Sequence, residues 1–141
     1  MINFALLGAG RIGSMHASLI ASSPQARLCY VYDTYQPAAI ELATKYDAYA
    51  VESVEQILND DSIDALLIAT STDTHVEFII KGALAGKAIL CEKPIDLSTE
   101  HVRQCWEQIK DCHVPIQIGF NRRFDPTHSE LKQQLSNGGI G

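Results

Sequence analysis

The stretch Gly8-Ala9-Gly10-Arg11-Ile12-Gly13 decides the fold, because its glycines have the spacing G-x-G-x-x-G. The residues before it, 2–7, form an apolar run that predicts a buried strand. The residues after it, 12–21, are predicted to form a helix. A glycine motif of this spacing is weak evidence when it stands alone, but a strand before it and a helix after it are the context in which the motif indicates dinucleotide binding.

Each glycine of the motif has its own task in such a turn. Gly8 permits the tight turn, Gly10 removes a Cβ where the backbone approaches a pyrophosphate, and Gly13 lets the helix pack closely on the strand. The N-terminus of the helix then offers free N–H groups and the positive end of its dipole to the phosphates. A glycine-rich turn without a ligand is the alternative. The residues predicted to bind the cofactor here are Gly8, Gly10, Arg11, Ile12 and Gly13.

Predicted strands and helices alternate along the rest of the chain. Continuous apolar runs such as residues 65–69 suit strands that are covered on both faces, as in a parallel sheet. The sequence therefore predicts an α/β fold with a doubly wound, mostly parallel sheet, which is a Rossmann fold. The predicted strands are 2–7, 26–32, 49–51, 65–69, 88–91 and 115–119, and the predicted helices are 12–21, 38–45, 54–59, 74–85, 98–111 and 126–135.

Composition limits the class of protein and its partners. The chain has 141 residues, 46% hydrophobic and 20% charged, which fits one folded domain rather than a disordered chain. Its 11 Lys and Arg against 17 Asp and Glu give a net charge of −6, which disfavours nucleic acid as a partner. No run approaches the roughly 20 apolar residues of a membrane span, and residues 1–12 lack the basic start of a secretory signal. The four cysteines form no C-x-x-C pair, so we predict reduced thiols, no metal site and a cytoplasmic location.

Asp33 stands at the end of the second predicted strand, twenty residues beyond Gly13. A carboxylate at this place accepts hydrogen bonds from the hydroxyls of the adenosine ribose and repels a 2′-phosphate. The next residues, Thr34 and Tyr35, include no arginine that would accommodate such a phosphate. We therefore predict NAD rather than NADP as the cofactor. An exposed aspartate at a strand end is the alternative.

Polar residues also follow the strand predicted at 65–69. Ligands of open parallel sheets bind beyond the carboxyl ends of the strands, so this segment meets the same edge as the glycine motif. Its members, Thr70, Ser71, Thr72 and His75, are predicted to lie along the ribose and pyrophosphate of the cofactor. The alternative is that the hydroxyl groups only cap the helix that follows.

Two further segments at this edge are candidates for substrate contact. Glu92-Lys93-Pro94 follows the strand 88–91, and a lysine there can hold a substrate hydroxyl and tune its proton. The alternative is a solvated surface lysine, and whether Pro94 is cis is not decided by the sequence. Arg122 and Arg123 follow the strand 115–119, where they are predicted to orient hydroxyls or phosphates, or else to form a salt-bridged elbow.

Together these segments resemble the N-terminal half of the Gfo/Idh/MocA oxidoreductases, the family of glucose–fructose oxidoreductase and inositol dehydrogenase. The resemblance covers the whole chain and is far more specific than the glycine motif alone. Within the family, residues 90–96 and 119–126 are most similar to inositol 2-dehydrogenases. The segments that carry the resemblance are 8–13, 63–65 with 70–75, 82–87, 92–94 and 122–126.

The resemblance implies NAD-linked oxidation of a secondary alcohol on a cyclitol or sugar, which gives a ketone. It implies that Lys93 is catalytic and contacts the substrate, and that Arg123 also contacts the substrate. The resemblance also implies that the glycine motif, Asp33 and Thr34 contact the cofactor. The other residues that it places along the cofactor are Thr70, Ser71, Thr72, His75, Glu92 and Lys93.

The family has a second α/β domain, with an aspartate–histidine acid/base pair, which has no counterpart in this chain. We therefore expect residues 1–136 to form the NAD-binding domain and residues 137–141 to begin the connection to a substrate domain. We expect a homo-oligomer for the complete enzyme, and for the chain alone a monomer that binds NAD and turns over little. Two alternatives stay open: a non-catalytic NAD-binding module, and a sibling dehydrogenase that acts on another sugar or on a biliverdin-like tetrapyrrole.

Overall fold

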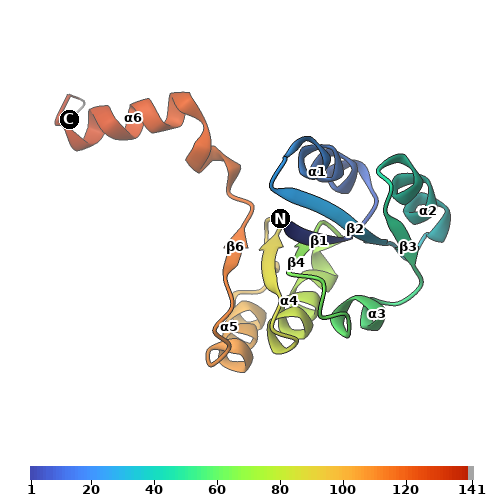
Figure 1. The fold of residues 1–141 in the computed structure, drawn as a ribbon. Helices are drawn as coiled ribbons and strands as arrows, with labels where there is room; N and C mark the ends of the chain where they lie inside the picture. Colours follow the sequence, from blue (N-terminus) through green and yellow to red (C-terminus); the bar gives the residue numbers. More distant parts are fainter. Residues whose placement is uncertain (140–141) are drawn as a thin grey trace.

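The computed structural model describes residues 1–139 as a six-stranded parallel sheet between two layers of helices (Figure 1). The strand order is β3-β2-β1-β4-β5-β6, so the chain winds outward from β1 first to one side and then to the other. Because every neighbouring pair is parallel, the carboxyl ends of the strands meet at one edge. The predicted fold is confirmed. The strands are β1 (Ile2–Leu7), β2 (Ala26–Tyr32), β3 (Tyr49–Val51), β4 (Ala65–Ile68), β5 (Ala88–Cys91) and β6 (Ile116–Ile118).

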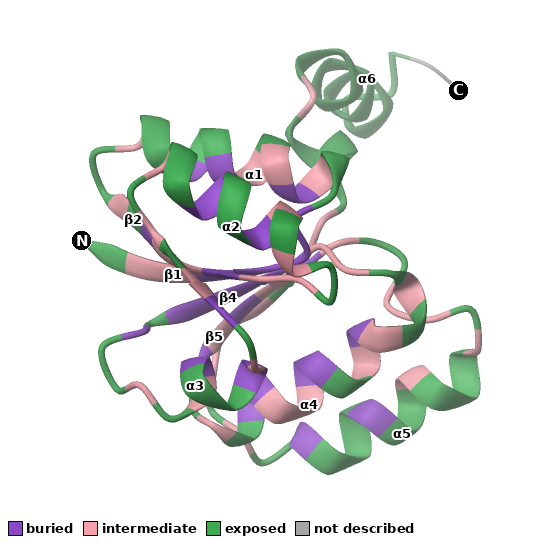
Figure 2. Cartoon of the chain, turned by 90° about the vertical axis from the view of Figure 1, so that its right-hand side faces the viewer, coloured by how far each residue is buried: buried purple, intermediate pink, exposed green. Residues whose placement is uncertain are grey.

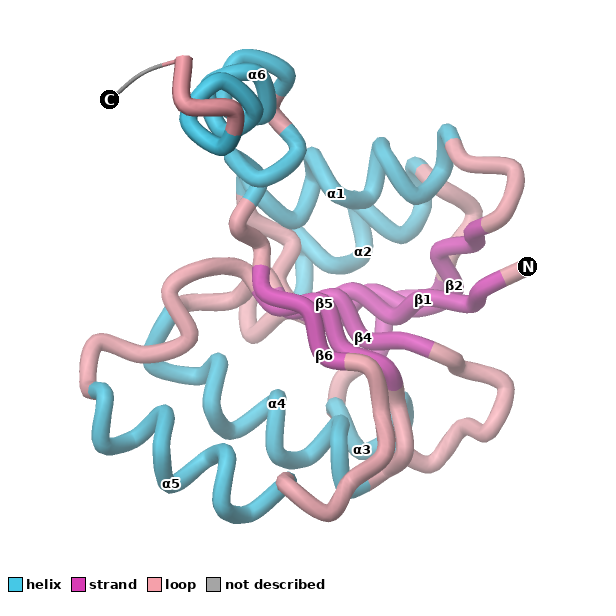
Figure 3. The backbone as a smooth tube through the Cα atoms, turned by 90° about the vertical axis from the view of Figure 1, so that its left-hand side faces the viewer, coloured by secondary structure: helices cyan, strands magenta, loops and turns pink. Residues whose placement is uncertain are grey.

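Helices cover both faces of the sheet. Figures 2 and 3 show α1 and α2 on one face, and α3, α4 and α5 on the other. This is the arrangement that right-handed crossovers produce when a sheet is wound in two directions. The helices are α1 (Arg11–Ser22), α2 (Gln36–Lys45), α3 (Val54–Leu58), α4 (His75–Leu84), α5 (Thr99–Ile109) and α6 (Pro126–Ser136), with 3₁₀ turns η1 (Thr72–Thr74) and η2 (Asn121–Phe124).

The alternation of side chains along β1 divides the core into two apolar clusters. Leu6 belongs to the cluster that includes Ala17 of α1 and Leu42 of α2. Its neighbours Ala5 and Leu7 belong to the cluster on the opposite face, with side chains of α3, α4 and α5. Successive residues of a strand point to opposite faces, so a fully buried strand needs apolar side chains at every position. Packing on both faces holds the strand ends, which carry the polar segments, in place.

The elements begin and end close to their predicted bounds. The segment 72–74 forms η1, so α4 begins at His75, one residue after its predicted start. Helix α2 begins two residues earlier than predicted, and Pro37 is tolerated because it lies in the first turn. Strand β4 ends at Ile68, although the N–H of Ala69 still donates to the carbonyl oxygen of Leu7 (2.8 Å).

Helix α6 lies apart from the sheet and from the helices that cover it (Figure 1). Each of its residues is exposed, and Asp125 caps its start by accepting a hydrogen bond from the N–H of His128 (3.1 Å). The predicted domain boundary falls where α6 ends, at Ser136. Of the predicted connection 137–141, residues 140 and 141 lie outside the described residues.

Two glycines make the turn between β1 and α1 possible. Gly8 has φ +98°, and a Cβ there would lie 2.5 Å from the carbonyl oxygen of Ala69. A Cβ at Gly13 would lie 1.9 Å from the carbonyl oxygen of Gly8. Both neighbours are backbone atoms, so neither can move aside cheaply. Gly10 differs, because no atom lies within 4 Å of the Cβ it would carry and its φ is −69°.

We predict that Gly13→Ala lowers the free energy of unfolding by about 3 kcal/mol, because its methyl group meets the backbone of Gly8. Gly10→Ala is the matched control, and its cost is about 1 kcal/mol, because glycine is preferred to alanine at a helix N-cap. Urea denaturation followed by circular dichroism measures both. Equal stability of the two variants would contradict this view of the turn.

Candidate functional site

A groove of about 420 Å³ lies at the carboxyl ends of β1, β2 and β4. It is the place where the strand order reverses, with β2 on one side of β1 and β4 on the other. In open parallel sheets this switch point is the usual place of ligand binding. The residues that line the groove are Gly8, Gly10, Arg11, Ile12, Tyr32, Asp33, Thr34, Ala69, Thr70, Ser71, Thr74 and Phe78.

The N-terminus of α1 opens into this groove through Gly10, its N-cap residue. No side chain caps the helix among the residues described, and its first turn carries no acidic residue. The first N–H groups of a helix have no partner within the helix, and they attract anions together with the helix dipole. The open space beside Gly10 therefore suits a phosphate group that approaches the backbone.

The carboxylate of Asp33 has a task that the sequence did not predict. Its Oδ2 accepts a hydrogen bond from the N–H of Ala9 (2.7 Å), and its Oδ1 accepts one from the N–H of Tyr35 (2.8 Å). Asp33 thus ties the glycine loop to the end of β2. Each carboxylate oxygen can accept more than one hydrogen bond, so capacity for the two ribose hydroxyls remains.

The segment after β4 contributes hydroxyl groups to the groove. Thr70 and Ser71 line it, whereas Thr72 lies in η1 and is not among the lining residues. Thr74, a further hydroxyl of this segment, also lines the groove, with its Oγ1 2.7 Å from Oγ1 of Thr70 and 2.8 Å from the carbonyl oxygen of Ser71.

Two aromatic side chains in the groove were also missed. Tyr32 and Phe78 both line it, and their rings meet edge to face with centroids 6.3 Å apart. Tyr32 is the last residue of β2, and Phe78 lies one turn into α4. They give this part of the groove an apolar wall, suited to the flat face of a heterocycle.

His75 is not among the residues that line the groove, and its contact with the cofactor stays a prediction. The side chain is buried, with 2% of its surface exposed. Its Nδ1 lies 2.8 Å from the carbonyl oxygen of Pro94, and its Nε2 lies 3.1 Å from that of Thr70. The ring is turned inward because it bridges two loops, one after β4 and one after β5.

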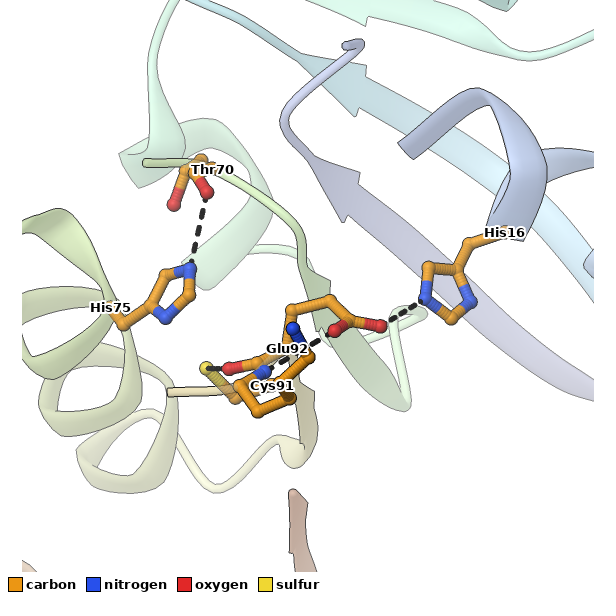
Figure 4. A network of polar contacts seen from close by, with 6 residues as sticks. His16, Thr70, His75, Cys91 and Glu92 are labelled. Carbon is orange, nitrogen blue, oxygen red and sulfur yellow. Dashed lines mark hydrogen bonds and ion pairs between the residues drawn. The ribbon is translucent and has the colours of Figure 1, made fainter. Parts of the chain in front are cut away.

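The segment Glu92-Lys93-Pro94 leaves the end of β5 through a cis peptide bond between Lys93 and Pro94. Lys93 is exposed, whereas Glu92 is partly buried and its Oε1 lies 2.9 Å from Nε2 of His16 on α1 (Figure 4). Neither Glu92 nor Lys93 is among the residues that line the groove. His16 was not predicted, because nothing in the sequence relates it to a residue so far along the chain.

The residue before this segment, Cys91, supports it from within the sheet. Cys91 is fully buried, and burial raises the pKa of its thiol to about 12. The neutral Sγ donates to the carbonyl oxygen of Glu92 (3.3 Å). Thiols in such apolar surroundings are inert, so Cys91 is a structural residue.

The predicted substrate contact Arg123 lies away from the groove. Together with Arg122 it lies on η2 and lines a separate hollow of about 400 Å³ with His128, Ser129 and Lys132. Both arginines are exposed. Within residues 1–139 the structure therefore brings the glycine motif, Asp33, Thr34, Thr70 and Ser71 together, and leaves Arg123 outside this group.

Fold and groove together define a dinucleotide-binding Rossmann domain. Residues 2–120 match the family model of the Gfo/Idh/MocA proteins, an oxidoreductase family with an NAD-binding Rossmann fold. The chain therefore belongs to this family. The predicted cofactor class, NAD, agrees with that assignment.

Three relatives illustrate the likeness. The chain is 44% identical over 140 residues to the inositol 2-dehydrogenase of Rhizobium meliloti (strain 1021). The matched region covers 99% of this chain and 42% of that protein. The myo-inositol dehydrogenase of Corynebacterium glutamicum superposes with a TM-score of 0.91 at 41% identity over 100% of this chain and 42% of the other. The scyllo-inositol dehydrogenase of Lactobacillus casei with bound NAD(H) and scyllo-inositol superposes at 0.93 with 28% identity, over 100% and 42%. The chain thus spans about two fifths of the length of these relatives.

Within residues 1–139, no helix is long and apolar enough to cross a membrane. No group of three or more His, Cys, Asp or Glu side chains in this range could hold a metal ion.

We predict that Gly10→Ala weakens NAD binding at least about tenfold, because the added methyl group occupies the space where the backbone approaches the pyrophosphate. Isothermal titration calorimetry on the 141-residue chain measures the change. A loss of unfolding free energy of no more than about 1 kcal/mol shows that the change in binding is local. An affinity equal to that of the unmodified chain would place the phosphates elsewhere.

Proposed function

We propose that this chain is the NAD-binding part of an oxidoreductase of the inositol 2-dehydrogenase type. Its reaction is the oxidation of a ring secondary alcohol, on myo-inositol or a related cyclitol or sugar, to the ketone. The observation that carries the proposal is the place of Lys93 at the same sheet edge as the groove. The relatives named above, two inositol dehydrogenases among the solved structures and one among the curated proteins, support the substrate class.

The register of the sheet brings Lys93 to the edge of the sheet at which the groove lies. Ile68 of β4 is paired with Cys91 of β5. Thr70, which lines the groove, stands two residues beyond Ile68, and Lys93 stands two residues beyond Cys91. The side chain of Lys93 is exposed, so it is available to a substrate at that edge.

The chemistry assigns each group one task. NAD supplies the acceptor for the hydride that leaves the alcohol carbon, while the C–O bond becomes a C=O bond and the hydroxyl proton leaves to a base. The Lys93 ammonium group has three donors and no acceptor, so it stabilises negative charge that develops on the substrate oxygen. The groups that would hold the cofactor in the groove are the N-terminus of α1, Asp33 and the hydroxyls of Thr70 and Ser71, all of which line it.

We propose NAD rather than NADP as the cofactor on the evidence of Asp33. Its carboxylate lines the groove at the end of β2, and Thr34 beside it carries no positive charge. A 2′-phosphate at this place would meet the negative carboxylate, and neither of the two residues after Asp33 is an arginine that would accommodate it. The homo-oligomer expected for the enzyme stays a prediction.

We predict that Lys93→Ala lowers kcat for myo-inositol oxidation at least roughly 100-fold in the full product of the gene, because general acid–base and electrostatic assistance are lost. Lys110→Ala, which removes an exposed lysine paired with Glu107, is the control and keeps full activity. Formation of NADH is followed by absorbance with myo-inositol, scyllo-inositol and glucose. NAD binding without turnover of any alcohol would instead indicate a non-catalytic NAD-binding module.

We predict that the double substitution Asp33→Ser with Thr34→Arg reverses the cofactor preference by at least about tenfold in favour of NADP. It removes the carboxylate that repels the 2′-phosphate and adds a guanidinium that accommodates it. Calorimetry with both cofactors gives the ratio of the two Kd values. The single variant Thr34→Arg separates the two contributions, and a ratio that is unchanged in both variants would refute the role of Asp33.

A further inference from the structure

Lys93 stands on a turn whose two neighbouring residues are each held by a histidine from a different helix. Glu92 contacts His16 of α1, and Pro94 contacts His75 of α4. Figure 4 shows the two imidazole rings on opposite sides of the strand end that carries Glu92. Neither histidine was predicted to act in this way, and neither touches the groove.

The His16 side of this arrangement fixes a carboxylate. His16 Nε2 lies 2.9 Å from Glu92 Oε1, and the two side chains are 15% and 21% exposed. The other oxygen, Oε2, accepts a hydrogen bond from the N–H of Lys93 (3.2 Å). Gly119 closes the third side, because a Cβ there would lie 3.1 Å from the Glu92 carboxyl group. The Glu92 carboxylate therefore connects His16 of α1 with the backbone N–H of Lys93.

The His75 side fixes the backbone on the other flank. Its Nδ1 lies 2.8 Å from the carbonyl oxygen of Pro94, and its Nε2 lies 3.1 Å from that of Thr70. Both partners are carbonyl oxygens, which accept hydrogen bonds, so the tautomer of the ring decides to which of the two the N–H donates. Because Thr70 lines the groove, the buried ring connects the groove wall with the turn that carries Lys93.

We propose that His16 and His75 are positioning residues, which hold the Glu92-Lys93-Pro94 turn in a fixed place relative to the cofactor groove. The inference rests on the proposed role of Lys93. Helix α1 provides both the anion-binding N-terminus and His16, and the loop after β4 provides both Thr70 and a partner of His75. The cofactor and Lys93 are thus located by the same two structural units, and a misplacement of about 1 Å between reacting groups costs about 100-fold in rate.

The test uses pairs of substitutions in the full product of the gene. His16→Leu and His75→Leu remove the donors, whereas His16→Gln keeps a donor at the place of Nε2 and His75→Asn keeps one at the place of Nδ1. We expect kcat to fall at least about tenfold in the leucine variants, with KM for NAD changed less than about threefold, and to recover in the amide variants. His113→Leu, at an exposed position, is the control.

A double-mutant cycle decides whether the histidines act through Lys93. In a Lys93→Ala background, the additional loss of kcat from His16→Leu or His75→Leu should disappear. Additive losses would overturn the inference, as would equal kcat losses in the leucine and amide variants.

An amide signature separates this inference from the proposed function. In ¹H–¹⁵N spectra of the 141-residue chain, the Lys93 amide resonance should move and its hydrogen exchange should accelerate in His16→Leu, and return in His16→Gln. If Lys93→Ala leaves turnover unchanged, the proposed function fails, and this amide response then decides the positioning role alone. No response of the amide would overturn the inference.

Discussion

The backbone contact between Gly8 and Gly13 is the constraint on which the site depends. With only 1.9 Å between the Gly8 oxygen and the Cβ that position 13 lacks, α1 reaches β1 more closely than any side chain would permit. The loop is then short enough for the N–H of Ala9 to meet Asp33 at the end of β2, while Gly8 lies against Ala69 at the end of β4. Two absent side chains, at Gly8 and Gly13, thus allow three strand ends to lie around the groove.

The same constraint explains how an acidic chain offers a site for an anion. The net charge is −6, but charges beyond a Debye length, about 8–10 Å at moderate ionic strength, are screened. Near the groove the positive end of α1 has no acidic residue in its first turn. Asp33 is the one carboxylate among the described residues that line the groove, and it lies where ribose hydroxyls are expected. Local geometry therefore outweighs net charge.

The fold and the centre of the groove could be predicted because they depend on local patterns. Apolar runs and the glycine spacing each define a strand end, and parallel pairing then brings those ends to one edge. The pair His16–Glu92 joins residues 76 positions apart, and no local period indicates such a contact. Arg123 shows the limit of the strand-end rule, which places the first residues after a strand but not the direction of the chain beyond them, here turned away by η2.

The support beneath Lys93 consists of side chains that contact the backbone of the turn and of one paired carboxylate. The Cys91 thiol, kept protonated by a pKa of about 12, donates to the Glu92 carbonyl, and the buried His75 contacts the Pro94 carbonyl. The one carboxylate of the turn is already paired with His16. Among residues 1–139, Lys93 makes no salt bridge within 4.0 Å. Because these contacts hold the residues on both sides of Lys93 and leave its side chain exposed, the turn can be rigid while the Lys93 ammonium stays available to a substrate oxygen.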